Sequence, residues 1–381
     1  MLVVGSGVRS ADAQKLMLEF VQKTDIPVLT TMNAVDLVQD KLKLGFMGVY
    51  GNRIANEILS HSDFVIAVGA RLGLRQIGNK PEYFAPNAKL LRIDIDEYEL
   101  SRTVKIDEEK RLLDAKDFFT LVLQEDVPKY TEWKKCCFEA KEILAPFDKV
   151  IGNLCIEKIS SMLPKNPVVA IDVGQNECWS AQSFTLKGND GRLMIGGGYG
   201  AMGCSLPWAI GASIANGKKT VYCVTGDGGL QMNIQELQTV VREKLPIKIL
   251  VINNRALGKI TEIQELSYEK RFAQTTDSSG YTVPDFEKVA EAYGIKAKTL
   301  ENYNDMDSCI DWLTDAEPCL INILLPENTK LIPKMNWNEK VMKPAIDENI
   351  VIDVDNILNR VGGYNCRVVS YATPHFKGVT E

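Results

Sequence analysis

The sequence predicts an α/β protein made of two doubly wound parallel sheets. Its 381 residues are enough for two domains, each with a core of its own. Short runs of apolar, β-branched residues alternate with amphipathic helical stretches, and this alternation stops and then restarts near residue 150. Neighbouring parallel strands need a crossover helix between them, so this alternation is typical of parallel sheets covered on both faces.

The first half of the chain supplies the first series of strands and helices. Strands are expected at 2–4, 26–30, 64–68 and 90–93, and helices near 10–23 and 52–60. A charged stretch over 108–144 has the character of a helix, contains Pro128 and ends at Ala145-Pro146. We therefore expect a first domain over 1–127 and a linker over 128–150.

The alternation restarts in the second half. Helices are expected near 152–162, from 202, near 233–243 and near 284–293, and strands at 168–171, 220–225, 247–252 and 319–324. After Pro326 the sequence becomes rich in Asn and Lys and contains two more prolines, Pro333 and Pro344. This pattern predicts a second domain over 151–330 and a C-terminal tail or lid over 331–381.

Composition excludes several classes of function. The 44 basic and 50 acidic residues give a net charge of −6 without long blocks of either sign, which argues against nucleic-acid or membrane partners. The two histidines, His61 and His375, are too few for most His-based metal centres and make a Ser-His-Asp triad improbable. The nine cysteines contain no C-x-x-C motif, which predicts reduced thiols and a cytoplasmic protein.

The segment with the clearest chemistry is Gly226-Asp227-Gly228-Gly229, which follows a predicted strand and precedes a helix. Glycines allow a ligand to approach the backbone closely, and a helix N-terminus offers free N–H groups and partial positive charge. The segment is therefore expected to bind a diphosphate.

Asn254 lies 27 residues after Asp227, at the end of the next strand. The carboxyl ends of parallel strands meet at one edge of the sheet, where open α/β sheets bind their ligands. A carboxylate and an amide oxygen, together with a backbone carbonyl and phosphate oxygens, suit the octahedral oxygen shell of Mg²⁺. The spacing thus predicts a magnesium site beside the diphosphate.

These motifs resemble those of thiamine diphosphate (ThDP) enzymes, and the surrounding sequence is similar to the large subunit of acetolactate synthase. The similarity covers about residues 1–330. It extends to the segment 172–175, to the helix start Gly200-Ala201-Met202-Gly203 and, in the first domain, to 68–71 and 94–96. The resemblance implies a ThDP-enzyme middle domain followed by the diphosphate-binding domain.

The resemblance also implies roles for individual residues. Asp227, Asn254 and the carbonyl of Ala256 would bind Mg²⁺, Met202 would bend the cofactor, and the carbonyl of Gly200 would accept from its amino group. The remaining cofactor contacts would come from Val173, Gly174, Gln175, Asn176, Gly226, Gly228, Gly229, Leu257 and Gly258. An FAD site in the first domain is a further implication, with contacts at Gly69, Ala70, Arg71, Arg75 and Asp94.

Four positions depart from the acetolactate synthase pattern. Ile263 occupies the position of a tryptophan that shapes the substrate pocket, Lys259 that of a methionine and Asn176 that of a histidine. Val49-Tyr50-Gly51 occupies the position of a Met-His-Gly segment of the flavin domain. These changes leave the identity of the 2-oxo acid open. Lys259 is interpreted either as favouring an acidic or phosphorylated substrate or as a solvated surface lysine.

The family's pyrimidine-binding domain, with its catalytic glutamate, has no counterpart in these 381 residues. The resemblance therefore implies that this chain alone binds at most half a cofactor site, completed within a homo-oligomer or by a separate pyrimidine-domain subunit. The expected activity is decarboxylation of a 2-oxo acid with carboligation. Alternatives are a simple 2-oxo acid decarboxylase, a carboligase of sugar metabolism, and a truncated or accessory scaffold without catalysis. A nicotinamide dehydrogenase rests only on Gly5-Ser6-Gly7 and lacks accompanying acid–base residues.

Overall fold

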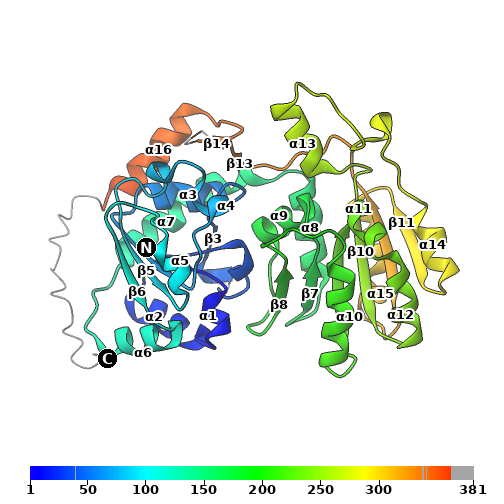
Figure 1. Ribbon diagram of the computed structural model, residues 1–381, viewed down its shortest axis with the longest axis horizontal. Helices are drawn as coiled ribbons and strands as arrows, with labels where there is room; N and C mark the ends of the chain where they lie inside the picture. The colour runs from blue at the N-terminus through cyan, green and yellow to red at the C-terminus, as the bar shows by residue number, and fades with distance from the viewer. Residues whose placement is uncertain (39, 337–338, 340, 362–381) are drawn as a thin grey trace.

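The computed structural model describes residues 1–381 except 39, 337–338, 340 and 362–381. Cys366 and His375 lie outside these described residues. Two six-stranded sheets, each with helices packed around it, lie side by side (Figure 1). All strand pairs within these two sheets are parallel, which confirms the predicted fold class. Among the described residues, no helix has the length and apolar character needed to cross a membrane.

The first sheet has the strand order β3-β2-β1-β4-β5-β6. Its strands are β1 (Leu2–Val4), β2 (Val28–Thr30), β3 (Lys43–Phe46), β4 (Phe64–Val68), β5 (Lys89–Asp94) and β6 (Glu108–Leu112). Its helices are α1 (Gly7–Ser10), α2 (Gln14–Thr24), α3 (Arg53–Ser60), α4 (Leu74–Ile77), α5 (Glu97–Ser101) and α6 (Ala115–Gln124). Helix α7 (Thr131–Leu144) lies within the segment expected to be a linker.

The second sheet has the strand order β11-β12-β10-β9-β7-β8. Its strands are β7 (Val168–Ile171), β8 (Arg192–Ile195), β9 (Val221–Gly226), β10 (Ile247–Asn253), β11 (Lys296–Leu300) and β12 (Cys319–Leu324). The helices are α8 (Ile151–Met162), α9 (Gln175–Ser183), α10 (Ser205–Ala215), α11 (Asp227–Met232), α12 (Leu237–Arg242), α13 (Gly258–Ser267), α14 (Phe286–Ala292) and α15 (Ile310–Thr314). The chain runs outward from β7 to β8 and then returns to place β9 on the other side of β7. This reversal creates a switch point between β7 and β9.

Three expectations about secondary structure are wrong in detail. Residues 108–112 form strand β6 instead of the start of a helix, because their backbone pairs with β5 from Leu90↔Glu108 onward. The helix expected from 202 begins at Ser205, after Gly203 at a φ of +83°. The C-terminal segment contains helix α16 (Glu348–Asn359) and a hairpin of β13 (Lys334–Met335) and β14 (Met342–Lys343), so it is not simply extended.

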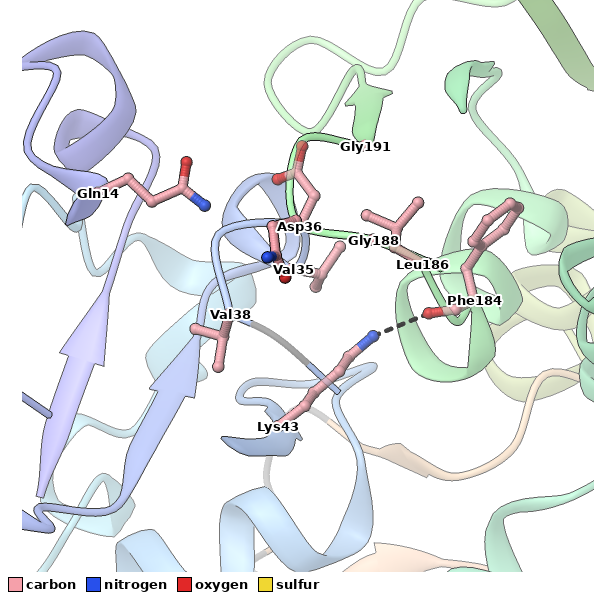
Figure 2. A pocket seen from close by; sticks show the side chains of 10 residues that line it. Gln14, Val35, Asp36, Val38, Lys43, Phe184, Leu186, Gly188 and Gly191 are labelled. Atoms are coloured by element: carbon pink, nitrogen blue, oxygen red, sulfur yellow. Dashed lines mark hydrogen bonds between the residues drawn. The ribbon is translucent and has the colours of Figure 1, made fainter. Parts of the chain in front are cut away.

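The two domains share a polar seam that starts at Asp36. This buried carboxylate pairs with Arg9 of its own domain, and in the second domain its Oδ2 accepts from Arg192 at 2.5 Å and from the Leu193 amide at 3.0 Å. Lys43 donates to the carbonyl of Phe184 at 2.9 Å, as Figure 2 shows. The pocket drawn there has a volume of about 10 Å³, enough for no more than one water molecule. It lies near β8 and is too small for a cofactor.

The C-terminal segment returns to the first domain, where α16 packs against α7 (Figure 1). The buried Arg53, at the start of α3, binds this returning segment through its guanidinium. Its guanidinium donates to the carbonyls of Met342 at 3.1 Å and Pro344 at 2.9 Å, and lies 3.5 Å from the carboxylate of Asp148. One buried cation thus joins α3, the linker and the C-terminal hairpin.

Replacement of Arg53 by methionine is expected to lower the free energy of unfolding by about 3–5 kcal/mol, because it leaves two carbonyls without their donor and the buried carboxylate of Asp148 without its counter-charge. Urea unfolding followed by circular dichroism measures this change. The matched control is Arg271→Met at an exposed arginine, which should stay within about 0.5 kcal/mol of the parent. A loss below about 1 kcal/mol for Arg53→Met contradicts this role for Arg53.

Candidate functional site

Three polar residues lie at the switch point of the second sheet. Asp172 directly follows β7, Asp227 follows β9 as the first residue of α11, and Asn254 directly follows β10. β9 pairs with both β7 and β10, so the three residues end neighbouring strands and meet at the same edge. All three are buried. The structure thus brings Asp227 and Asn254 to the same edge of the sheet, and their membership of one metal site stays a prediction.

Asp172 connects the loops of this site. Its carboxylate accepts hydrogen bonds from the amides of Val173 and Gly203 at 2.9 and 3.0 Å and from the hydroxyls of Ser205 and Thr225 at 3.1 and 3.0 Å. Burial raises the pKa of Asp172, and these four donors oppose the shift by stabilising the charged form. A single side chain therefore holds the ends of β7 and β9 and the turn before α10.

Asp227 has one satisfied and one unsatisfied carboxylate oxygen. Oδ1 accepts from the Gly228 amide at 2.6 Å and from the Tyr281 hydroxyl at 3.2 Å. Oδ2 is buried and has no hydrogen-bond partner among the described residues. Burial raises the pKa of Asp227 to about 6, and the hydrogen bond from Gly228 opposes that rise. A buried oxygen without a donor is the kind of group that a cation can satisfy.

The two residues of the Asn253-Asn254 pair have different roles: Asn253 stabilises the turn, and Asn254 faces the site. Asn253 donates to the Asn322 side chain at 3.1 Å and accepts from the Arg255 amide at 3.0 Å. The second bond stabilises Arg255 at a φ of +53°, an uncommon conformation for a residue with a Cβ. The turn places Ala256, which is buried, two residues after the metal candidate Asn254.

Glycines leave room in this site for other groups. A Cβ on Gly229 would lie 2.5 Å from Asp172 Oδ2, and one on Gly258 would lie 2.0 Å from Gln175 Oε1. A Cβ on Gly228 would lie 3.0 Å from the methyl carbon of Met202. A side chain at any of these positions would displace these neighbouring groups, and the Met202 side chain ends over the start of α11. Gly226 faces Asn176, whose Oδ1 lies 3.5 Å from the position of its Cβ.

Arg75 from the first domain also reaches this region. A Cβ on Gly200 would lie 3.3 Å from Val173 and 3.7 Å from Nη2 of Arg75. Gly200 itself has a φ of +66°, a conformation that favours glycine. Val173 and Gly200, two of the residues expected to contact the cofactor, are thus neighbours, with a guanidinium from the other domain beside them.

Helix α9 begins at the site and carries an unusual number of buried polar side chains. Gly174, at a φ of +129°, is its N-cap, and Asn176 donates back to the Asp172 carbonyl at 2.9 Å. Gln175 accepts from the Asn254 side chain at 3.0 Å, so its amide faces the metal candidate. Glu177 is buried, and its Oε1 has no hydrogen-bond partner in the described part of the chain. Burial raises the pKa of Glu177 to about 7, against the opposing charges of Lys259 and Arg75.

Lys259 is not a solvated surface lysine. Its Nζ lies 3.2 Å from the centroid of the Tyr50 ring and 3.5 Å from Cys178 Sγ. A cation over an aromatic face is stabilising, and here the contact also joins the two domains. Ile263, at the position expected to differ from the family tryptophan, is nearly half exposed on α13.

The residues expected to contact FAD lie in two regions. Gly69, Ala70 and Arg71 follow β4 and Asp94 ends the neighbouring strand β5, so they share one sheet edge. Arg71 there is largely exposed and pairs with Glu99 at 2.6 Å, whereas Arg75 lies beside Gly200 of the second domain. FAD binding stays a prediction.

The glycines behind the dehydrogenase alternative pack against backbone. Gly5 and Gly7 donate their amides to the carbonyls of Val68 and Gly69 at 2.9 and 3.1 Å. A Cβ on Gly5 would lie 1.9 Å from the Gly69 carbonyl oxygen. These amides are therefore engaged within the sheet edge and do not face a dinucleotide phosphate.

Three residues of this region received no individual role from the sequence. Asp172 begins the segment 172–175 that carries part of the resemblance, and it follows a strand in the same way as Asp227. Glu262 of α13 is buried and accepts from Gln175 at 2.7 Å, yet a glutamate within a charged helical stretch gives no sign of burial. Tyr281 reaches Asp227 from a long loop with no regular pattern.

The chain is similar to known proteins over most of its length. The family model "Thiamine pyrophosphate enzyme, central domain" matches residues 1–121, and "Thiamine pyrophosphate enzyme, C-terminal TPP binding domain" matches residues 172–323. Acetolactate synthase isozyme 2 large subunit of Escherichia coli (strain K12) is 31% identical over 343 residues, which are 87% of this chain and 61% of that protein. The acetolactate synthase large subunit of Lactococcus lactis subsp. lactis (strain IL1403) is 32% identical over 366 residues, 92% of this chain and 62% of that protein. The chain spans about 60% of the length of these curated relatives.

Glu177→Gln is expected to stabilise the protein at pH 8 by about 1–3 kcal/mol, and this gain should shrink toward pH 5. The folded-state pKa of about 7 lies above the ordinary value of 4.5, so the folded protein binds the proton more tightly. The contribution of protonated Glu177 to stability is therefore fully present below pH 4.5 and is lost as the pH rises through 7. Denaturant unfolding at a series of pH values measures the difference. Glu291→Gln, at an exposed glutamate, should follow the parent profile. A Glu177→Gln variant less stable than the parent at pH 8 would show that Glu177 is a stabilising anion.

Proposed function

We propose, since this chain belongs to the thiamine pyrophosphate enzyme family, that it supplies the diphosphate- and Mg²⁺-binding part of an acetolactate-synthase-type enzyme acting on 2-oxo acids. The observation that carries the proposal is the pair of ligands at the switch point. Asp227 presents a buried oxygen without a partner among the described residues, and Asn254 follows the neighbouring strand with its amide nitrogen already engaged.

The residues present fit a diphosphate held through a magnesium ion. Asp227 Oδ2, Asn254 Oδ1 and the carbonyl of Ala256 would bind Mg²⁺, for which oxygen ligands are preferred. The amides of Gly228 and Gly229 at the start of α11, and of Gly174 and Gln175 at the start of α9, would receive the diphosphate. ThDP, when bound, supplies the electron sink for decarboxylation of a 2-oxo acid.

The protein's own residues would bind and orient this cofactor. Met202 ends over Gly228 and would press on the cofactor from the side of α11, while the carbonyl of Gly200 would accept a hydrogen bond from it. Met202 and Gly200 would thereby hold the bound cofactor in one orientation, and such positioning acts as a proximity effect. Arg75 and Lys259 place positive charge near the same loops and suit the carboxylate of an oxo acid.

The surface around the site suggests a partner. Tyr199 is fully exposed, Met202 and Met232 are 38% and 57% exposed, and Ile260 and Ile263 are exposed on α13, the helix that follows Asn254. Exposed apolar side chains near a binding site are typical of interaction surfaces. We propose that a pyrimidine-binding domain on a separate subunit covers this surface and supplies the catalytic glutamate.

A simple 2-oxo acid decarboxylase is the second candidate. Ile263 occupies the expected tryptophan position and is exposed, so this chain places no bulky aromatic ring there to receive a second oxo acid. An accessory scaffold that binds ThDP without turnover remains a third. Each of the eight cysteines among the described residues is a free thiol, which is consistent with the proposed cytoplasmic location.

Asp227→Ala is expected to abolish the Mg²⁺-dependent part of ThDP binding, because it removes the carboxylate that would face the metal. Calorimetric titration of ThDP into the purified chain, with Mg²⁺ and with EDTA, measures this part. Asp126→Ala, at an exposed aspartate of the first domain, is the control and should bind as the parent does. Unchanged affinity in Asp227→Ala would remove the metal assignment.

The 381-residue chain alone is expected to release no CO₂ from pyruvate, because the open site lacks the glutamate of a pyrimidine-binding domain. Addition of a separately produced pyrimidine-binding domain should produce turnover, and Asp227→Ala should abolish it. Product analysis by chromatography then separates acetolactate from acetaldehyde. Turnover by the chain alone contradicts the partner proposal, and ThDP binding without turnover in the mixture favours the scaffold.

A further inference from the structure

Helix α13 buries a single residue, and that residue is a glutamate. Within Gly258–Ser267, all of which the structure describes, Glu262 alone is buried, at 5% exposure, whereas Ile260, Ile263 and Leu266 are exposed. A carboxylate is among the groups that lose most free energy when they leave water, so its burial needs specific partners. The partners of Glu262 show what its burial accomplishes.

Both carboxylate oxygens of Glu262 are engaged. Oε1 accepts from Gln175 Nε2 at 2.7 Å and from the amide of Leu331 at 2.8 Å. Oε2 accepts from Lys334 Nζ at 2.5 Å, and this amine is itself mostly buried. Glu262 therefore connects the start of α9 to the C-terminal segment, with a lysine that compensates its charge.

These contacts determine the orientation of the Gln175 amide. An ionised carboxylate can only accept hydrogen bonds, so the group that faces it must be the NH₂ end of Gln175. The same Nε2 donates to the carbonyl of Thr329 at 3.0 Å, another group that can only accept. Both protons of Nε2 are thus used, and Oε1 of Gln175 has to point the other way.

The orientation of the Gln175 amide in turn determines that of Asn254, the metal candidate. Gln175 Oε1 accepts from Asn254 Nδ2 at 3.0 Å, which fixes the NH₂ end of Asn254 toward α9 and leaves its Oδ1 for the site. A metal ion needs the oxygen of an amide, since the NH₂ end offers no lone pair for it. A Cβ at Gly258 would lie 2.0 Å from Gln175 Oε1, so the glycine at the start of α13 makes space for this contact.

We propose that Glu262 is a positioning residue for Mg²⁺, because through Gln175 it sets the orientation of the Asn254 amide. We call these three side chains the relay, and the segment from Thr329 to Lys334 is its second support. The inference rests on the proposed function, because it assumes that Asn254 binds the metal. It adds a reason for the course of the C-terminal segment, which returns past α13 and gives Gln175 and Glu262 the partners that hold them in one orientation.

The test is the apparent Mg²⁺ affinity of Glu262→Gln at saturating ThDP, measured by calorimetry with MgCl₂ on the full chain. The variant side chain has nearly the same shape but can present an NH₂ group to Gln175. The Gln175 amide can then turn its oxygen toward position 262, and the Asn254 amide can turn with it. We expect Mg²⁺ to bind about 10- to 100-fold more weakly, the range found for outer-shell partners of metal ligands, with metal-free ThDP binding unchanged. The control is Glu265→Gln on the same helix, which removes an equal charge from an ion pair with Lys330 and should bind Mg²⁺ as the parent does.

A double-mutant cycle with Asn254→Asp separates orientation from simple support of the fold. An aspartate presents oxygen at both ends and needs no orientation, so Glu262→Gln should cause no loss of Mg²⁺ affinity in the Asn254→Asp background. In the double variant Gln175 is no longer held by Glu262. Its NH₂ end can donate to the aspartate carboxylate, which strengthens the contact between these two side chains. Equal losses in both backgrounds, or a Glu262→Gln variant that binds Mg²⁺ normally, overturn the inference.

The same measurements distinguish this inference from the proposed function. If the parent chain shows no Mg²⁺ dependence, or Asp227→Ala retains it, the proposed function fails and the relay fails with it. If Asp227→Ala loses the dependence while Glu262→Gln keeps it, only the relay is wrong.

Discussion

The site depends on one buried carboxylate, that of Asp172. At the switch point the chain leaves β7 in one direction and β9 in the other, and the loops after them would separate without a common anchor. Four donors from three segments converge on Asp172. Hydrogen bonds to a charged group are stronger than neutral ones, and removal of this acceptor would take the partner from the amides of Val173 and Gly203 and from the Ser205 hydroxyl. Neither Asp227 nor Met202 could hold its place without the loops that Asp172 connects.

The other polar groups of the site differ in how far their hydrogen bonds are satisfied. Gln175 and Glu262 have all their strong hydrogen bonds satisfied, and they form a rigid surround. Asp227 and Glu177 each keep a buried oxygen without a partner among the described residues, which costs folding free energy. Such incomplete satisfaction is expected where a protein prepares a place for a ligand, because the ligand supplies what folding leaves out.

Within the two large sheets, the strands that the sequence predicted and those it missed differ in one physical respect. All eight predicted strands lie inside the sheets, whereas the four that were missed, β3, β6, β8 and β11, are the edge strands. Interior strands of a parallel sheet are covered on both faces and are almost continuously apolar, as the Ile, Leu and Val residues of β10 illustrate. Edge strand β6 is partly exposed and carries the charges of Glu, Lys and Arg, so its sequence is easily taken for an exposed helix. β3 and β8 are more buried than β6, but each is only four residues long and gives a short signal.

The sequence alone determined the two-sheet fold, the residues after β9 and β10 that would hold a metal and diphosphate, and the resemblance to ThDP enzymes. These follow from local patterns, since a strand end, a glycine turn and a helix start are adjacent in the chain. Only the tertiary structure decided which amide end Asn254 presents, why Glu262 is buried, and that Arg75 and Tyr50 of the first domain reach the second. Such relations join residues that are far apart in the chain, as in Asn254 with Gln175, 79 positions away, and Lys259 with Tyr50 of the other domain. No periodicity in the sequence records them, because they depend on how separate elements pack.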